Sequence, residues 1–276
     1  PVIVWFRNDL RTADNAALCA AADAGRPLIC LWVRDFDGPV RAPGGAQTWW
    51  LHHSLAALAE KLAKLGVPLT LRSGNPAFVL DTLINETSAS SVFWNRRYDP
   101  AAIPLDASIK TGLREKGIEV RTFDGQLLHE PTQIRTGGGT PFKVFTPFWR
   151  TVRSGPEPRL PYSEPLKLFA FSDRIQSERL EDWNFLPVKP DWAGGMREEW
   201  TPGEAGAVER LADFIDGALD GYSDDRNIPG RLTTSKLSPH LALGEITPFQ
   251  LWHAAPKAKS ASGRDVEKFR SEVGWR

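Results

Sequence analysis

The feature of this sequence that most constrains its fold is a regular alternation of apolar runs and helical patterns over residues 1–126. Short apolar runs that predict buried strands lie at residues 2–6, 28–33, 69–71, 91–94 and 120–123. Segments with helical spacing separate these runs, at residues 15–24, 49–65, 77–85 and 105–116. Five strands alternating with four helices predict an α/β domain, a doubly wound parallel five-stranded sheet covered by helices on both faces.

Sheets of this kind usually bind ligands at the carboxyl ends of their strands. The glycine patterns that hold phosphates in many such proteins are missing, because the chain contains neither G-x-G-x-x-G nor a P-loop sequence. An ordinary dinucleotide-binding domain is therefore disfavoured.

The character of the sequence changes after residue 126. Residues 127–200 contain recurrent prolines and a triple glycine at 137–139, which predict an extended connector without long regular elements. Residues 201–276 turn helical, with apolar spacing at 207–219, 237–243, 248–253 and 266–276. We therefore predict an α/β domain over 1–126, a connector over 127–200 and the beginning of an all-α domain over 201–276. The sequence ends inside a helical pattern without a capping signal, so we expect a C-terminally truncated chain.

Composition excludes several classes of protein. The chain carries 34 Lys and Arg against 34 Asp and Glu, so its net charge gives no signal for nucleic acid. Cys19 and Cys30 form no disulfide framework and have no zinc-ligand spacing, which favours a reducing cytoplasm and no metal. No apolar run approaches the length of about 20 residues that spans a bilayer. The 11 tryptophans suit a protein that handles a flat chromophore, although core packing is the simpler interpretation.

One stretch, Thr233 to Ile246, suggests an anion site. Ser238 followed by Pro239 predicts a helix N-cap with proline at the first helical position. Hydroxyl side chains and Lys236 stand just upstream, where free N–H groups and the helix dipole favour an anion. A Ser/Thr-rich capping turn that binds nothing fits the same local pattern.

Three motifs in order resemble the photolyase/cryptochrome family and together cover the whole chain. They are P-V-I-V-W-F-R-N-D-L-R at the start, G-Y-S-D-D-R-N-I-P followed by T-S-K-L-S-P-H-L-A-L-G, and K-F-R-S-E-V-G-W-R at the end. Three further stretches are most similar to plant-cryptochrome-like (class III) photolyases: W-N-R-R-Y-D-P, Q-L-L-H-E-P and F-T-P-F-W-R. The resemblance implies an antenna domain followed by a helical FAD-binding domain.

The resemblance also implies a set of site residues. The flavin contacts carried over from the family are Tyr222, Thr234, Ser235, Lys236, Leu237, Ser238 and Arg276. Arg226 matches an arginine that touches DNA, Glu272 a glutamate that binds the damaged bases, and Trp275 a tryptophan that packs on the flipped dimer. Without the resemblance, Arg226 is a surface charge paired with a neighbouring aspartate, Glu272 a solvated residue and Trp275 a core residue.

The activity implied is light-driven repair of cyclobutane pyrimidine dimers in DNA by electron transfer from excited, fully reduced FAD. The chain as it stands is expected to have little or no repair activity. A monomer is expected.

An antenna chromophore, methenyltetrahydrofolate or a deazaflavin, is implied as well. Alanines at 101 and 102 replace an Asn-Glu pair that holds folate in some relatives, and Trp49 and Trp50 could stack on a chromophore or pack in the core.

Alternatives remain open at this point. A cryptochrome, a blue-light receptor without repair activity, shares the same motifs, although Glu272 and Trp275 favour repair. A stand-alone α/β nucleotide-binding module ending near Gln126 is disfavoured by the motif at 222–238. The sequence does not separate cyclobutane-dimer repair from repair of the (6-4) lesion.

Overall fold

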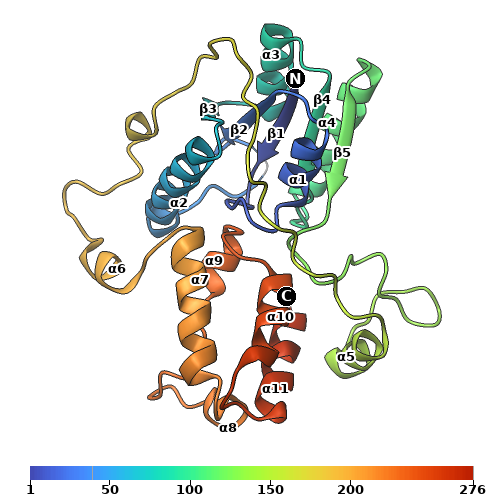
Figure 1. Ribbon diagram of the computed structural model, residues 1–276, viewed down its shortest axis with the longest axis vertical. Helices are drawn as coiled ribbons and strands as arrows, with labels where there is room; N and C mark the ends of the chain where they lie inside the picture. The colour runs from blue at the N-terminus through green and yellow to red at the C-terminus, as the bar shows by residue number, and fades with distance from the viewer. Residues whose placement is uncertain (39, 276) are drawn as a thin grey trace.

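The structure, a computed structural model, describes residues 1–38 and 40–275. Its N-terminal half is built on a five-stranded parallel sheet with the strand order β3-β2-β1-β4-β5 (Figure 1). The strands are β1 (Val2–Phe6), β2 (Leu28–Arg34), β3 (Leu69–Ser73), β4 (Ser91–Asn95) and β5 (Glu119–Phe123). All five overlap the predicted apolar runs, so the doubly wound α/β fold is confirmed.

Helices cover both faces of the sheet. They are α1 (Ala16–Asp23), α2 (Gly45–Lys64), α3 (Pro76–Thr87) and α4 (Ala102–Glu115). Val2, Val4 and Phe6 of β1 share a core with α1 and α2. Ile3 and Trp5 of the same strand share a second core with α3 and α4. Successive side chains of a strand point to opposite faces, which explains why an apolar run without alternation fits a sheet buried on both sides.

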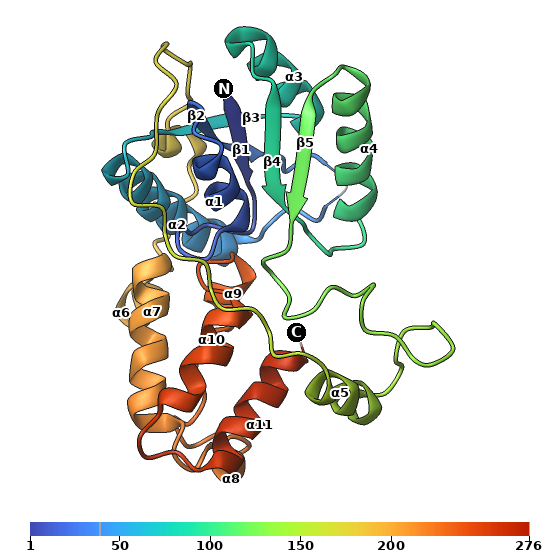
Figure 2. The same ribbon diagram turned by 45° about the vertical axis from the view of Figure 1, so that its right-hand side comes forward.

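The chain order reverses at β1, which lies between β2 and β4. In doubly wound sheets this switch point opens a crevice at the carboxyl ends of the two strands. Figure 2 shows that these ends point toward the C-terminal helices. The loops that follow β1, β4 and β5 therefore lie between the sheet and the helical part of the chain.

The connector contains more helix than its composition predicts. Its elements are α5 (Phe145–Ser154), the 3-10 helix η1 (Leu180–Trp183) and α6 (Gly194–Glu199). The expectation of no long regular element is wrong at α5, a helix of ten residues. Proline is tolerated in a first helical turn, where its missing N–H has no partner to lose, and Pro147 stands there. Between these elements the connector runs over the sheet and returns to the helical part (Figure 1).

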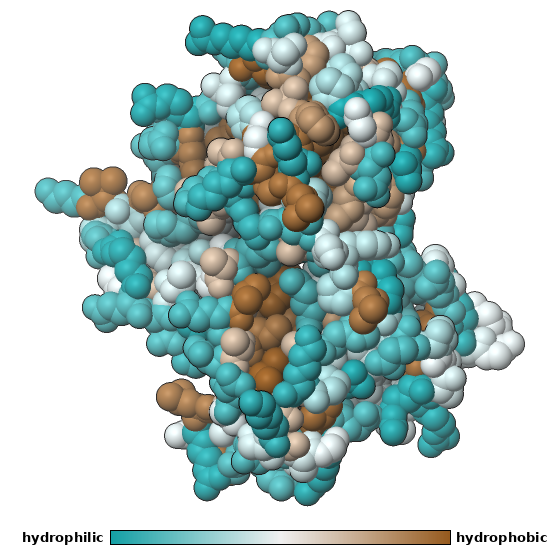
Figure 3. All heavy atoms as spheres, in the orientation of Figure 1, coloured by the Kyte–Doolittle hydropathy of each residue, from teal (hydrophilic) through white to brown (hydrophobic). Residues whose placement is uncertain are grey.

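The helical part packs against the end of the sheet to which the strands point. Its elements are α7 (Glu204–Asp213), the π-helical turn η2 (Phe214–Ala218), α8 (Tyr222–Asp225), α9 (Ser238–Ala242), α10 (Pro248–Ala254), the 3-10 helix η3 (Ala255–Lys257) and α11 (Gly263–Gly274). Phe214, Leu237, Phe249 and Phe269 belong to one buried core here. Figure 3 shows apolar side chains reaching the surface between α7 and α10. The three-part division of the chain at residues 126 and 200 stays a prediction.

Candidate functional site

The turn that precedes α9 brings the predicted flavin residues to a surface. Lys236 adopts a left-handed conformation with a φ of 51°. The Ser235 hydroxyl accepts a hydrogen bond from the backbone N–H of Leu237 at 3.4 Å. Leu237 is buried, whereas Thr234 and Ser238 are exposed. The hydroxyl groups of this turn, residues 234–238, therefore face solvent while its leucine anchors it in the core.

The prediction that Ser238 caps α9 is wrong. Leu237 occupies the N-cap position, and no side chain makes a capping hydrogen bond there. Ser238 is the first helical residue and Pro239 the second. The left-handed Lys236 turns the chain one residue earlier than the Ser-Pro signal suggests, so the hydroxyl of Ser238 stays available to another partner.

A cavity of about 360 Å³ lies between this turn and α7. Thr234, Ser235 and Lys236 line it on one side, and Arg210 and Phe214 on the other. The Lys236 ammonium donates to the Glu199 carboxylate at 2.6 Å, and this hydrogen bond lowers the pKa of Glu199. Because Glu199 stays ionised beside it, the lysine charge is partly neutralised. An anion in the cavity would therefore depend mainly on hydroxyl and backbone N–H donors.

A second cluster joins α8 to α11. The Arg226 guanidinium lies 2.8 Å from one carboxylate oxygen of Glu272, and the Lys268 ammonium lies 2.9 Å from the other. Arg226 also lies over the ring of Tyr222 at 5.7 Å. Tyr222 is buried, which raises the pKa of its phenol and keeps it protonated at neutral pH. Two of the predicted DNA residues thus contact each other directly.

This pairing corrects the simpler interpretation of Arg226 and Glu272. The neighbouring aspartates, Asp224 and Asp225, pair with Arg264 and Arg231 rather than with Arg226. Glu272 is held by two cations rather than left to solvent. Lys268 is not among the predicted site residues, although its spacing of four residues from Glu272 on one helix is a recognised ion-pair signal.

Trp275 lies at the surface rather than in the core, with 60% of its side chain exposed. Its ring stacks on Phe145 of α5 with centroids 4.0 Å apart and planes 9° from parallel. Phe145 in turn stacks on Trp149 with centroids 6.0 Å apart. The structure thus brings α5 of the connector beside the last predicted lesion residue. Arg276, the remaining predicted flavin contact, lies outside the described residues.

A separate cavity of about 320 Å³ lies at the carboxyl edge of the sheet, at the switch point of the chain order. Its lining includes residues from the loops after three strands: Asn8 after β1, Arg97 and Tyr98 after β4, and Leu127 after β5. Ala102 also lines it. A site for a small ligand at this place is typical of the fold class.

The adjacent tryptophans Trp49 and Trp50 pack in the core rather than at a chromophore site. Trp49 and Trp50 are 1% and 5% exposed and form a core with Ala193. The indole N–H of Trp50 donates to the buried carboxylate of Glu245 at 2.9 Å. Neither ring is free to stack on a ligand in this structure.

Two absences concern the described residues only. Residues 1–38 and 40–275 contain no group of three His, Cys, Asp or Glu side chains placed to hold a metal ion. Within the same ranges no helix has both the length and the apolar character needed to cross a membrane.

Comparison with known proteins identifies the family. The sequence model described as DNA photolyase matches residues 2–165. The chain belongs to the DNA photolyase family. A deoxyribodipyrimidine photo-lyase of Agrobacterium fabrum is 50% identical, and the match covers 100% of this chain and 57% of that protein. The crystal structure of a bacterial class III photolyase from Agrobacterium tumefaciens is 49% identical with a TM-score of 0.96, and it covers 100% of this chain and 57% of the other.

A cryptochrome is also among the relatives. Cryptochrome-1 of Arabidopsis thaliana is 36% identical over 99% of this chain and 42% of its own length. The chain therefore spans between 42% and 57% of these relatives. The predicted family membership is confirmed, and the similarity to class III photolyases is stronger than to this cryptochrome. The roles of the individual site residues stay predictions.

Proposed function

We propose that this photolyase-family chain serves in light-driven repair of cyclobutane pyrimidine dimers in DNA. The observation that carries the proposal is the contact between Arg226, matched to an arginine that touches DNA, and Glu272, matched to a glutamate that binds the damaged bases. Tyr222, matched to the flavin site, packs beside Arg226 in the same cluster. The similarity to a deoxyribodipyrimidine photo-lyase over the whole chain supports the same activity.

The turn at 234–238 fits the pyrophosphate of FAD. Thr234, Ser235 and Ser238 offer hydroxyl donors at the start of a helix, and the cavity beside them accommodates phosphate groups. Leu237 and Tyr222 belong to one buried core, and together with Lys236 and Arg276 they complete the proposed FAD contacts. Bound in its reduced form, FAD supplies on excitation the electron that splits the dimer. Because Thr234 and Ser238 are exposed, the described residues hold such a cofactor from one side only, and we expect weak binding.

The chain's own groups would orient the lesion. Arg226 and Lys268 hold the side chain of Glu272 between them, and its carboxylate oxygens are proposed to accept a hydrogen bond from an N–H of a pyrimidine base. Trp275 offers an exposed ring on which a flipped pyrimidine dimer can pack. Phe145, stacked on that ring, holds it in place. Arg226, ion-paired with Glu272, is proposed to contact the DNA beside the lesion.

The cavity at the switch point suits the antenna chromophore, methenyltetrahydrofolate or a deazaflavin. Tyr98 and Arg97 offer a ring and a cation to a flat anionic ligand there. We also propose a monomeric cytoplasmic protein whose partner is dimer-containing DNA. Blue-light signalling without DNA repair is the second candidate function. The 36% identity to Cryptochrome-1 of Arabidopsis thaliana favours this candidate.

The test is light-dependent loss of thymine dimers from an irradiated oligonucleotide, measured with reduced FAD present. Both the 276-residue polypeptide and the longest protein encoded by its gene are assayed. We expect little repair by the polypeptide, clear repair by the longer protein where one is encoded, and a loss of about 10- to 100-fold in that protein on Glu272→Ala.

Glu267→Ala is the matched control, because Glu267 lies on the same helix and pairs with Arg153 instead. An equal loss in both variants would contradict the role of Glu272. Tight flavin binding without any affinity for dimer-containing DNA would favour the cryptochrome alternative.

A further inference from the structure

A buried carboxylate joins the helical part to α2 of the α/β part. Glu245 is fully buried and accepts hydrogen bonds from the Trp50 indole N–H at 2.9 Å and from the Ser54 hydroxyl. Its Oε1 also accepts the backbone N–H of Gly203 at 2.8 Å, just before α7 begins. Three donors from two distant segments therefore converge on one oxygen. A buried carboxylate satisfied in this way has a fixed orientation, because any rotation leaves N–H or O–H groups unpaired.

The second oxygen of Glu245 holds a histidine. His240 Nδ1 lies 2.5 Å from Glu245 Oε2, and the ring is fully buried. The ring packs edge-on against Trp50, with centroids 5.0 Å apart, and against Trp200 at 6.4 Å. His240 lies on α9, four residues after Lys236. The histidine therefore ties the helix that follows the 234–238 turn to α2.

The backbone beside Glu245 is fixed against the α/β part as well. The N–H of Leu10 donates to the carbonyl of Leu243 at 3.0 Å. Arg11 donates to the carbonyl of Gly244 at 2.8 Å. Gly244 has a φ of 65°, and a Cβ there would lie 2.1 Å from the carbonyl oxygen of Asn8. These contacts fix the backbone at Leu243 and Gly244, next to Glu245, against the loop after β1. We therefore expect that loss of the Glu245 carboxylate displaces α9 rather than this backbone.

We propose that Glu245 and His240 are positioning residues that fix the 234–238 turn relative to the α/β part. Neither side chain lines the cavity beside the turn, so their effect passes through α9. The chain of contacts that fixes the turn begins at Trp50 and Ser54 of α2, continues through Glu245 to His240, and reaches the turn through α9. The consequence for ligand affinity rests on the proposed flavin function, whereas the consequence for the geometry of the turn does not.

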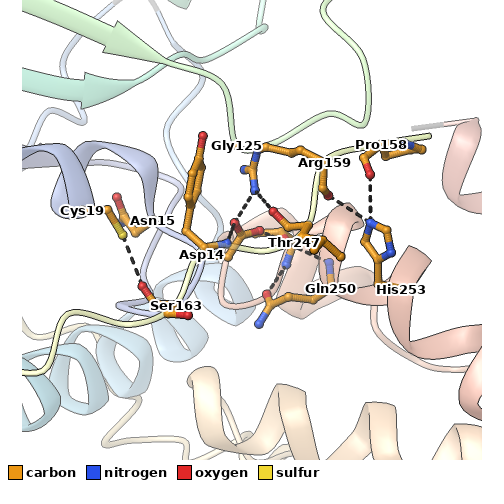
Figure 4. A network of polar contacts seen from close by, with 12 residues as sticks. Asp14, Asn15, Cys19, Gly125, Pro158, Arg159, Ser163, Thr247, Gln250 and His253 are labelled. Atoms are coloured by element: carbon orange, nitrogen blue, oxygen red, sulfur yellow. Dashed lines mark hydrogen bonds and ion pairs between the residues drawn. The ribbon is translucent and has the colours of Figure 1, made fainter. Parts of the chain in front are cut away.

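A second buried carboxylate provides a matched comparison. Asp14 is fully buried in the same contact region and accepts hydrogen bonds from Arg159 at 2.6 Å, the backbone N–H of Tyr162 at 2.9 Å and the hydroxyl of Thr247 at 2.5 Å. Arg159, Asp14 and Thr247 lie together in Figure 4. Thr247 caps α10, not α9. Loss of Asp14 should therefore weaken the same contact region without releasing the turn.

The test compares Glu245→Ala, Glu245→Gln and Asp14→Ala in the 276-residue chain. Deuterium uptake is measured in peptides covering residues 233–243, together with the free energy of unfolding. We expect faster uptake in these peptides for Glu245→Ala than for Asp14→Ala. The glutamine variant should restore slow uptake, because its amide keeps an acceptor for Trp50 and offers a donor to His240 Nδ1. Equal uptake in both alanine variants, or no rescue by glutamine, would overturn the proposal.

The affinity for FAD, followed by quenching of flavin fluorescence, is the second readout. Glu245→Ala is expected to raise the dissociation constant about tenfold more than Asp14→Ala, because a turn that is not preorganised costs binding energy. If the unaltered chain binds no FAD, the proposed function fails while the exchange result still decides the positioning role. If FAD binds and both alanine variants weaken it equally, the coupling from Glu245 to the flavin turn is contradicted.

Discussion

Replacing Arg11 by methionine is expected to lower the free energy of unfolding by about 3–5 kcal/mol, the usual cost of removing one partner from a buried charged network. Arg11 is fully buried, and its guanidinium donates to the carbonyls of Asp14, Gly244 and Gly125 at distances from 2.8 to 3.2 Å. These carbonyls belong to three segments: the loop after β1, the segment after α9 and the loop after β5. Burial lowers the pKa of Arg11, and the neighbouring Asp14 and Asp9 oppose that shift. Methionine fills the space but leaves the carbonyls without a donor.

The measurement is urea unfolding followed by tryptophan fluorescence and far-UV circular dichroism. Arg26→Met is the matched control, because Arg26 bonds Ser91 and Glu119 at a partly exposed site. That variant should change stability by less than about 1 kcal/mol. An Arg11→Met variant as stable as this control would show that the contacts of Arg11 contribute little to the fold.

The second large effect is expected for Gly244→Ala, with a loss of at least about 3 kcal/mol. The φ of 65° already disfavours alanine, and the added Cβ would lie 2.1 Å from the carbonyl oxygen of Asn8. The backbone atoms of Asn8 and Asp9 cannot move aside as a flexible side chain would. The segment after α9 would therefore have to separate from the loop after β1. We expect the variant to lose contact between the helical part and the sheet.

Gly112→Ala is the control with the opposite sign. Gly112 lies within α4, and a Cβ there meets nothing within 4 Å. Alanine in a helix interior should add about 0.5–1 kcal/mol of stability. The pair is compared by thermal unfolding, and equal melting temperatures for the two variants would refute the close approach at Gly244.

Local pattern was enough to predict the sheet and its helices. The spacing of five leucines predicted α2: Leu51, Leu55, Leu58, Leu62 and Leu65. The first four are buried in the helix, whereas Leu65 is the half-buried C-cap residue. The start of α11 at Gly263 was missed by three residues, although Ser262 and Asp265 form a capping box that signals it. α5 was missed because the prolines around it predict irregular structure. The apolar spacing within the helix, which includes the buried Val152, was not taken as a helical signal.

The contacts of the candidate site depend on distances in space that spacing does not give. Arg226 was assigned to its sequence neighbours, yet its partner Glu272 comes from another helix. Glu245 carried no signal at all, because its donors Trp50 and Ser54 lie nearly 200 residues earlier in the chain. The stacking of Trp275 on Phe145 could not be predicted, because Phe145 belongs to α5, a helix of the connector far earlier in the chain.

A titration of the chain with FAD decides whether the 234–238 turn is a flavin pyrophosphate site. Flavin fluorescence is measured with the unaltered chain and with Ser235→Ala and Ser172→Ala, the latter an exposed serine of the connector far from the turn in sequence. We expect weak saturable binding, competition by ADP, and a loss of affinity of about tenfold for Ser235→Ala only. Binding that Ser235→Ala leaves unchanged, or no binding at millimolar FAD, would show that the turn does not hold the flavin pyrophosphate.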